Sequence, residues 1–318
     1  MKGSAANASL WNELPWRRFA AFASPQNRFQ NLSALLTECK LPFSVVCLSG
    51  GKKPASHFFI SPAKGGEAET VLIAHYDCAD GSPGANDNAA AVFILIETAL
   101  KLLNVKKTGW FIILTDNEEL ESGESLRGQG SFALANFFRN GARNTRGEKQ
   151  SAERNLHPVF NAMPKFFIFD LCGTGGTLII STMADYLLKT EKGAGTIDIQ
   201  KDFAGLRRYA MAKAEETARA FLLMPVPFSD DGGFLRAGLA AQLITALPAA
   251  EASAFAARSR SDPLCVNALI NGRLRKTRDP ALFPETWRIM NTPDDTIERL
   301  TPEHFGGIVR FAAALCGA

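Results

Sequence analysis

The sequence predicts an α/β protein in which helices cover a largely buried β-sheet. Short apolar runs bounded by turn residues, which are typical of buried strands, recur along the chain. A segment with apolar residues at helical spacing lies between two of these runs, and the order strand, helix, strand is that of α/β architecture. At 318 residues the chain is long enough for a sizeable core, in one larger domain or in two smaller ones.

The elements are expected in the following order along the chain. Five apolar runs predict buried strands, at residues 43–48, 71–74, 110–114, 166–169 and 243–247. A helix is expected at residues 89–103, where Val92, Ile96, Ala99 and Leu103 share one face. Residues 141–155 contain almost no apolar side chains and predict a mobile surface loop. Residues 249–278 hold two basic clusters and predict a solvated helical face with its connection.

The composition is that of an ordinary globular protein, with 46% hydrophobic and 21% charged residues. The formal net charge of +3 is too small to indicate nucleic-acid binding, and no basic stretch is interleaved with aromatic residues. Residues 1–20 are polar and charged throughout, so we expect no secretory signal, no membrane span and a cytoplasmic location. Six scattered cysteines without CxxC spacing indicate reduced thiols.

Residues capable of metal chemistry begin where the first strongly apolar strand ends, at His75-Tyr76-Asp77. Side chains two residues apart on a strand point the same way, so the carboxylate of Asp77 is expected beside His75. A metal-binding histidine needs such a neighbour, because a hydrogen bond to its other ring nitrogen fixes the tautomer and the orientation. Taken alone, this pattern is equally compatible with a structural histidine.

Two further groups of polar residues follow the next elements. Asn86-Asp87-Asn88 immediately precedes the expected helix, where each residue suits a helix N-cap and an acidic residue is also placed to bind a metal. Asp116-Asn117-Glu118-Glu119 follows the third strand. Carboxylates at the mouth of a buried sheet repel one another unless a cation or protons compensate, so this group favours a metal site over a solvated turn.

The fourth strand ends at Asp170, before the glycine-rich segment 173–176. That segment lacks the spacing and the lysine of a phosphate-binding loop. The histidine, the aspartates and the glutamates of these motifs thus lie in order at successive strand ends. Such strand ends form the edge of an open α/β sheet, where binding sites are normally built.

In these motifs the sequence resembles the zinc exopeptidases that include bacterial leucyl-type aminopeptidases and glutaminyl cyclases. The resemblance rests on His75-Tyr76-Asp77, residues 82–88, Asp116-Asn117-Glu118-Glu119 with Gly130-Ser131, and Asp170, and it continues in residues 229–234 and 291–296. It implies a single domain over residues 1–318, with three α/β/α layers around a central mixed, mostly parallel sheet of the phosphorylase/hydrolase-like type.

The resemblance also implies a role for each site residue. Asp87 would bridge two zinc ions, with a cis peptide bond after it, and His75 and Asp170 would complete one of the two sites. Glu119 would bind the second ion, Glu118 would be the general base, and Asp77 would orient His75. Adjacent side chains diverge, so one glutamate is free to hold metal while the other faces the water to be deprotonated.

The sequence departs from the family pattern at Asn291, which stands where the last ligand is a histidine. An amide oxygen is a poor substitute for imidazole on zinc, so the Glu119 site is expected to be weakened and the protein to hold one or two zinc ions. His304 is expected on the surface, in the first turn of a C-terminal helix. His57 and His157 have no motif around them, and each is expected to be exposed or satisfied by local bonds.

The predicted function is metal-dependent removal of N-terminal residues from peptides that have a free N-terminus. A family member that has kept the fold but acts as a binding or scaffold protein is the main alternative, against which the presence of Glu118 argues. Glutaminyl cyclase activity is less favoured, because those enzymes use the final histidine that Asn291 replaces. Residue preference and oligomeric state are not indicated by the sequence.

Overall fold

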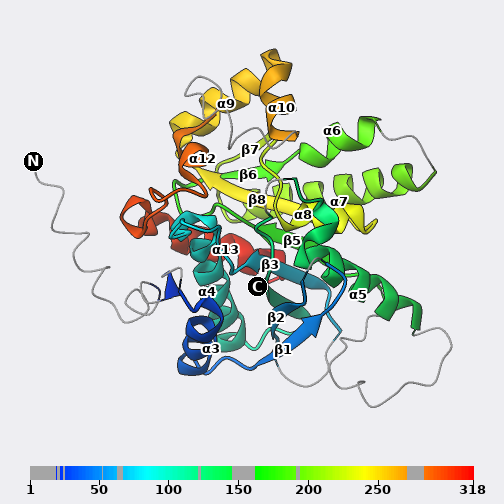
Figure 1. The fold of residues 1–318 in the computed structure, drawn as a ribbon, viewed down its shortest axis with the longest axis vertical. Helices are drawn as coiled ribbons and strands as arrows, with labels where there is room; N and C mark the ends of the chain where they lie inside the picture. The colour runs from blue at the N-terminus through cyan, green and yellow to red at the C-terminus, as the bar shows by residue number, and fades with distance from the viewer. Residues whose placement is uncertain are drawn as a thin grey trace, which may run out of the picture.

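A computed structural model describes residues 19, 22–23, 26–51, 53–62, 67–120, 123–144, 162–190, 194–270 and 283–318. Within them the chain forms a single α/β domain around an eight-stranded sheet with the strand order β1-β2-β4-β3-β5-β8-β6-β7 (Figure 1). The strands are β1 (Phe43–Leu48), β2 (Ala55–Ile60), β3 (Thr70–His75), β4 (Trp110–Thr115), β5 (Lys165–Phe169), β6 (Thr177–Ser181), β7 (Phe221–Met224) and β8 (Gln242–Leu247).

Helices lie on both faces of this sheet, so the domain has three α/β/α layers (Figure 1). One face packs against α3 (Arg28–Glu38), α4 (Ala90–Asn104), α7 (Ala194–Glu216) and α13 (Phe305–Leu315). The other packs against α5 (Gly130–Asn144), α8 (Asp230–Arg236), α9 (Ala249–Ser261), α10 (Pro263–Ile270) and α12 (Glu285–Ile289). The helix α6 (Met183–Thr190) and the short turns η1 (Ala85–Ala89), η2 (Leu126–Gly128), η4 (Ile297–Arg299) and η5 (Pro302–His304) complete the described elements.

The sheet alternates its side chains between two apolar cores because it is buried on both faces. In β3, Leu72 and Ala74 belong to one core, whereas Val71 and Ile73 belong to the other. Parallel pairing joins β4, β3, β5 and β8 in the middle of the sheet and β6 to β7 at its end, and antiparallel pairing joins the remaining neighbours. The predicted mixed, mostly parallel sheet is confirmed.

All five predicted strands and the predicted helix are present, within one or two residues at each end. The expectation that residues 43–48 are buried is wrong, because β1 pairs only with β2 and leaves Ser44, Val45 and Cys47 exposed at the sheet edge. The strands β2, β6 and β7 were not predicted. The β2 sequence mixes serine and histidine with apolar residues, and β7 has only four residues.

The two segments predicted to lie outside the core are helical where the structure describes them, which was predicted for residues 249–278 but not for residues 141–155. Residues 141–144 end the helix α5 instead of beginning a loop, and residues 145–155 lie outside the described part of the chain. Residues 249–270 form α9 and α10. Both helices expose side chains to solvent and also bury side chains, such as Phe255 and Cys265, in the core. Residues 271–278 lie outside the described residues. None of the described helices is long and apolar enough to cross a lipid bilayer.

The glycine-rich segment 173–176 has a packing role beside the site. Gly175 has a φ of +73°, and a Cβ placed there would collide with the backbone of Leu247 and Pro248 at the end of β8. Backbone atoms do not move aside as a flexible side chain does. The glycine therefore permits the loop after Asp170 to lie directly against β8.

Replacing Gly175 with alanine is expected to lower the free energy of unfolding by about 2–4 kcal/mol, because the left-handed strain adds to overpacking. Gly81→Ala is the matched control, since Gly81 has a φ of +80° but nothing lies within 4 Å of its added Cβ. It is expected to cost only about 1–2 kcal/mol. Urea unfolding measures both changes, and equal losses in the two variants would contradict the packing role.

Candidate metal centre

The site lies at the carboxyl ends of three neighbouring parallel strands. β3 lies between β4 and β5, and it ends at His75. β4 ends at Thr115, just before Asp116, and β5 ends at Phe169, just before Asp170. Because these strands run parallel, their ends meet at the same edge of the sheet.

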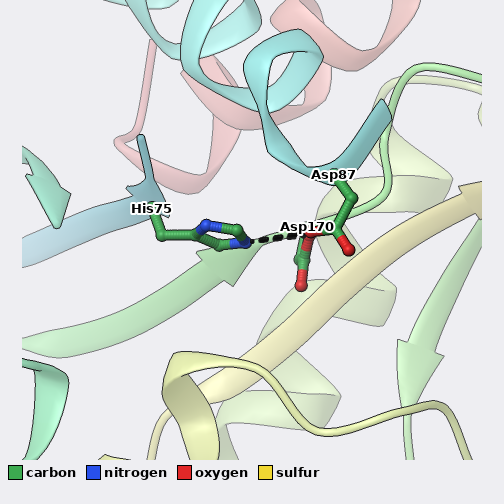
Figure 2. A group of neighbouring side chains, drawn as sticks. All are labelled: His75, Asp87 and Asp170. Atoms are coloured by element: carbon green, nitrogen blue, oxygen red, sulfur yellow. Dashed lines mark ion pairs between the residues drawn. The ribbon is translucent and has the colours of Figure 1, made fainter. Parts of the chain in front are cut away.

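His75, Asp87 and Asp170 converge at this edge. The Nε2 atom of His75 lies 3.2 Å from Oδ1 of Asp87 and 3.6 Å from Oδ1 of Asp170, and Figure 2 shows both carboxylates facing the ring. One ligand atom from each residue lies within 4.8 Å of the other two, and all three residues are buried. The group joins a strand end, the turn before α4 and a second strand end.

The chemistry of this group fits a bound cation such as zinc. His75 is fully buried, and its Nε2 atom makes no hydrogen bond although two carboxylates face it. Burial alone would lower the pKa of His75, but the carboxylates of Asp170, Asp77 and Asp87 raise it well above its ordinary value. The pocket thus attracts positive charge, and one imidazole with two carboxylates is a three-ligand set that catalytic zinc accepts.

The turn that carries Asp87 is fixed by the two asparagines beside it. Asn86 Oδ1 accepts a hydrogen bond from the Gly173 amide at 2.7 Å, and Asn88 Nδ2 donates to the Phe169 carbonyl at 2.9 Å. The first bond attaches the turn to the loop after Asp170, and the second attaches it to the last residue of β5. The Asp87-Asn88 peptide bond is cis, as the family resemblance implies. The three clustered polar residues are therefore more than a helix cap.

Asp77 connects His75 to the two glutamates. Its Oδ1 lies 3.5 Å from Nδ1 of His75, and its two carboxylate oxygens accept hydrogen bonds from the amides of Glu118 and Glu119 at 3.2 and 3.0 Å. Burial would raise the pKa of Asp77, but His75 and the two amides lower it below its ordinary value. One ionised carboxylate thus faces the ring nitrogen remote from the ligand group and fixes the backbone of the glutamates.

The two glutamates differ in their surroundings. Glu118 Oε1 accepts a hydrogen bond from Gln129 Nε2 at 2.9 Å, and burial raises the pKa of Glu118 well above its ordinary value. The charge of His75 opposes that rise, and the charges of Glu119, Asp170 and Asp230 add to it. Within the described residues, the group of side chains close enough to share one ion does not include Glu119.

The segment that carries Asn291 lies against the Asp87 turn. Asp295 accepts hydrogen bonds from three successive amides of that turn: its Oδ1 from Asn86 at 2.8 Å, its Oδ2 from Asp87 at 3.0 Å and its carbonyl from Ala85 at 3.2 Å. Asn291 has a φ of +57°, and its Oδ1 is buried without a hydrogen-bond partner. The side-chain amide oxygen of Asn291, which lacks a hydrogen-bond partner, thus lies four residues along the chain from Asp295, which binds the Asp87 turn.

The sequence model of peptidase family M28 matches residues 60–315, which include every residue of the site described above. This chain belongs to peptidase family M28. The family agrees with the one that the motifs resemble. No curated protein sequence matches the M28 chain.

Solved structures with the same fold include aminopeptidases and glutaminyl cyclases. The glutaminyl cyclase of Porphyromonas gingivalis matches with a TM-score of 0.58 at 13% identity, over 96% of this M28 chain and 95% of its own. The LapA aminopeptidase of Legionella pneumophila matches with a TM-score of 0.56 at 15% identity, over 99% of this M28 chain and 73% of its own.

A third match is a zinc aminopeptidase from Bacillus subtilis, with a TM-score of 0.48 and 18% identity. The match covers 83% of this M28 chain. The chain spans only about half of that protein's length, because the match covers 49% of it. The identities are too low for these likenesses to show more than the shared fold.

Sequence reasoning missed several buried residues of the M28 site. Asp230 and Asp231 are buried at the start of α8, and burial raises their pKa values to about 6 and about 8. Thr115 Oγ1 donates a hydrogen bond to Asp230 at 2.5 Å. The motif 229–234 contained these acids, but nothing in it distinguished buried carboxylates from an exposed helix start. Asp295 likewise lies in a recognised motif, whereas Arg28, at the start of α3, carries no sequence signal.

Of the other histidines, the two that the structure describes, His57 and His304, do not belong to the ligand group. His57 is buried in β2, where its Nδ1 accepts a hydrogen bond from the Asp116 amide at 3.3 Å. The expectation of an exposed or locally bonded side chain is therefore wrong. His304 is at the predicted place, just before α13, but it is half-buried and lies close to Gly176 rather than on the surface. His157 lies outside the described residues.

His57 provides a test of the buried surroundings of β2. Desolvation lowers its pKa from 6.5 to about 4. The unfolded chain therefore binds a proton between pH 6.5 and 4 that the folded protein does not, and stability falls as the pH falls through this window. Between pH 7.5 and 5, wild type is expected to lose about 2 kcal/mol more unfolding free energy than His57→Gln. Urea unfolding at both pH values measures this difference, and identical losses would show that His57 titrates normally.

Proposed function

We propose that this M28 protein is a metal-dependent aminopeptidase that hydrolyses peptides from a free N-terminus. The observation that carries the proposal is the convergence of His75, Asp87 and Asp170, with Glu118 held beside them by Gln129. Similarity to aminopeptidases of the same fold supports it. A cytoplasmic location is part of the proposal, supported by six free cysteines.

His75, Asp87 and Asp170 would hold one zinc ion, while Glu119 and Asn291 would contribute to a weaker second site. Zinc, when bound, acts as a Lewis acid that polarises the scissile carbonyl and makes a water molecule more acidic. Asp77 orients His75 through Nδ1, which directs Nε2 towards the two carboxylates. The buried surroundings exclude bulk water and strengthen each of these interactions.

Glu118 would move the proton of the reaction. As general base, it removes a proton from the attacking water while the water oxygen bonds to the carbonyl carbon. It then passes the proton to the leaving amine nitrogen as the carbon–nitrogen bond breaks. The same burial that raises the pKa of Glu118 suits it to hold a proton between the two steps, and Gln129 fixes the position of the carboxylate.

Replacing Glu118 with glutamine is expected to lower turnover of aminoacyl chromogenic substrates by about 10²–10⁴-fold and to leave the metal content unchanged. Glutamine preserves the shape of the side chain but does not accept a proton. Exposed Glu303→Gln is the control and is expected to keep wild-type activity. Elemental analysis and a panel of substrates provide the two measurements.

Three results of that experiment would count against the proposal. Metal without turnover, unchanged by Glu118→Gln, would favour a binding or scaffold protein. Cyclisation of N-terminal glutamine without release of amino acids would favour a glutaminyl cyclase. Turnover that survives Glu118→Gln would remove Glu118 from the mechanism.

Replacing Asn291 with histidine is expected to increase the zinc bound per chain, because imidazole is a far better zinc ligand than an amide oxygen. Histidine tolerates the left-handed backbone found at Asn291 better than most residues. Asn291→Gly is the control for backbone effects and is expected to bind no more zinc than wild type. Titration calorimetry reports the stoichiometry, and no gain in the histidine variant would place residue 291 outside the centre.

A further inference from the structure

Arg28 is a buried arginine that reaches the site from outside the family-matched segment. It begins α3, whereas the match to family M28 starts at residue 60. Only 5% of the residue is exposed. A buried guanidinium needs hydrogen-bond acceptors on all sides to offset the loss of water. The acceptors of Arg28 therefore indicate what the residue does.

The guanidinium of Arg28 binds four backbone carbonyls of one loop, residues 76–84. Its Nη1 donates to the carbonyls of Tyr76 at 3.0 Å and Asp77 at 3.3 Å. Its Nη2 donates to the carbonyls of Pro83 at 2.5 Å and Gly84 at 2.9 Å. One planar group thus joins the first two residues of the loop to its last two.

This loop connects two residues of the ligand group. It starts directly after His75, the last residue of β3, and ends directly before η1, which carries Asp87. Gly84 has a φ of +61°, and a Cβ there would lie 2.8 Å from Nη2 of Arg28, so the glycine leaves room for the guanidinium. The contact between α3 and this loop therefore connects the turn to the end of β3, in addition to the bonds that Asn86, Asn88 and Asp295 make with the turn.

We propose that Arg28 is a positioning residue of the metal centre, and that it sets the spacing between His75 and Asp87 by fixing both ends of loop 76–84. The proposal rests on the proposed function only in taking the His75, Asp87 and Asp170 group as the site of the ion. It gives the N-terminal helix α3 a part in building a centre whose ligands all come from later in the chain.

Lysine does not replace arginine in this role. Its ammonium is a compact point charge, whereas the guanidinium is a flat fork whose separate nitrogens reach carbonyls on opposite sides. Arg28→Lys therefore keeps the charge and the long stem but loses the geometry. Comparing Arg28→Lys with wild type therefore separates an electrostatic effect on the acidic site from a positional effect on the loop.

An open cavity beside Arg28 permits a rescue experiment. The cavity has a volume of about 450 Å³, and its lining includes Arg28, Tyr76, Asp77 and Asp116. In Arg28→Ala, free guanidinium is expected to enter from solvent and to occupy the position of the missing group. Guanidinium at a few millimolar is far below the concentration at which it denatures proteins.

The test measures zinc affinity by chelator competition and amide exchange in the metal-free protein. Arg28→Lys is expected to weaken zinc binding by about tenfold or more, the usual effect of losing a group that supports metal ligands. Exchange of the Ser82 and Gly84 amides, which are hydrogen-bonded inside the loop, is expected to accelerate. Millimolar guanidinium is expected to strengthen zinc binding by Arg28→Ala and to leave wild type unchanged.

Leu32→Ala is the matched control, because Leu32 is buried in the same helix and belongs to the apolar core. It destabilises α3 by removing core packing and is expected to keep zinc affinity within about twofold of wild type. Equal losses of affinity in Leu32→Ala and Arg28→Lys would overturn the proposal, since general helix stability would then explain both. Wild-type affinity and exchange in Arg28→Lys would overturn it as well.

Failure of the proposed function gives a different result. If wild type binds no zinc, the aminopeptidase proposal fails, and amide exchange in the loop alone decides the role of Arg28. Unchanged exchange in Arg28→Lys would then overturn the positioning role. Faster exchange confined to the loop would support it.

Discussion

A buried imidazole nitrogen facing two buried carboxylates imposes the main physical constraint on this structure. His75 Nε2, Asp87 and Asp170 lie within ion-pair distance in a place where water is excluded, and Asp77, Glu118, Asp230 and Asp231 add further carboxyl groups nearby. Several negative charges so close together require protons or a cation. Burial raises the pKa values of Glu118, Asp230 and Asp231, and neighbouring carboxylates add to that rise. Burial acts to lower the pKa of His75, but the carboxylates around it raise that pKa well above its ordinary value.

The backbone around the site is arranged to keep these groups together against their repulsion. Asp295 accepts hydrogen bonds from the amides of the Asp87 turn, and Asn86 and Asn88 attach the same turn to the loop after β5 and to the end of β5. Asp77 holds the amides of both glutamates while it faces His75. The carboxylate of Asp77 is a charged acceptor, and its hydrogen bonds are stronger than the neutral bonds of Asn86 and Asn88. Together these hydrogen bonds fix the positions that the ligands would need before any ion binds.

The central strands, and the edge at which their polar ends meet, were predictable from the sequence. Continuous apolar runs identify β3, β4, β5 and β8 because a strand buried on both faces needs no polar alternation, and one-residue errors at their ends do not move His75 or Asp170. The edge strand β1 was identified, but its exposure was not, because apolar content alone does not show which strand lacks a neighbour. The hydrogen bonds of Asp295 to the Asp87 turn join residues over 200 positions apart, and those of Arg28 to the loop 76–84 join residues about 50 positions apart. No local sequence pattern encodes such contacts. Asp230 and Asp231 stand in a recognised motif, but their burial depends on how α8 packs against the sheet.

The most direct measurement is a crystal structure of the protein grown with zinc, with anomalous scattering recorded at the zinc absorption edge. The account predicts an anomalous peak about 2.0–2.2 Å from His75 Nε2 and from one carboxylate oxygen each of Asp87 and Asp170. Zinc bound elsewhere on the protein, with no peak among these three residues, would contradict it.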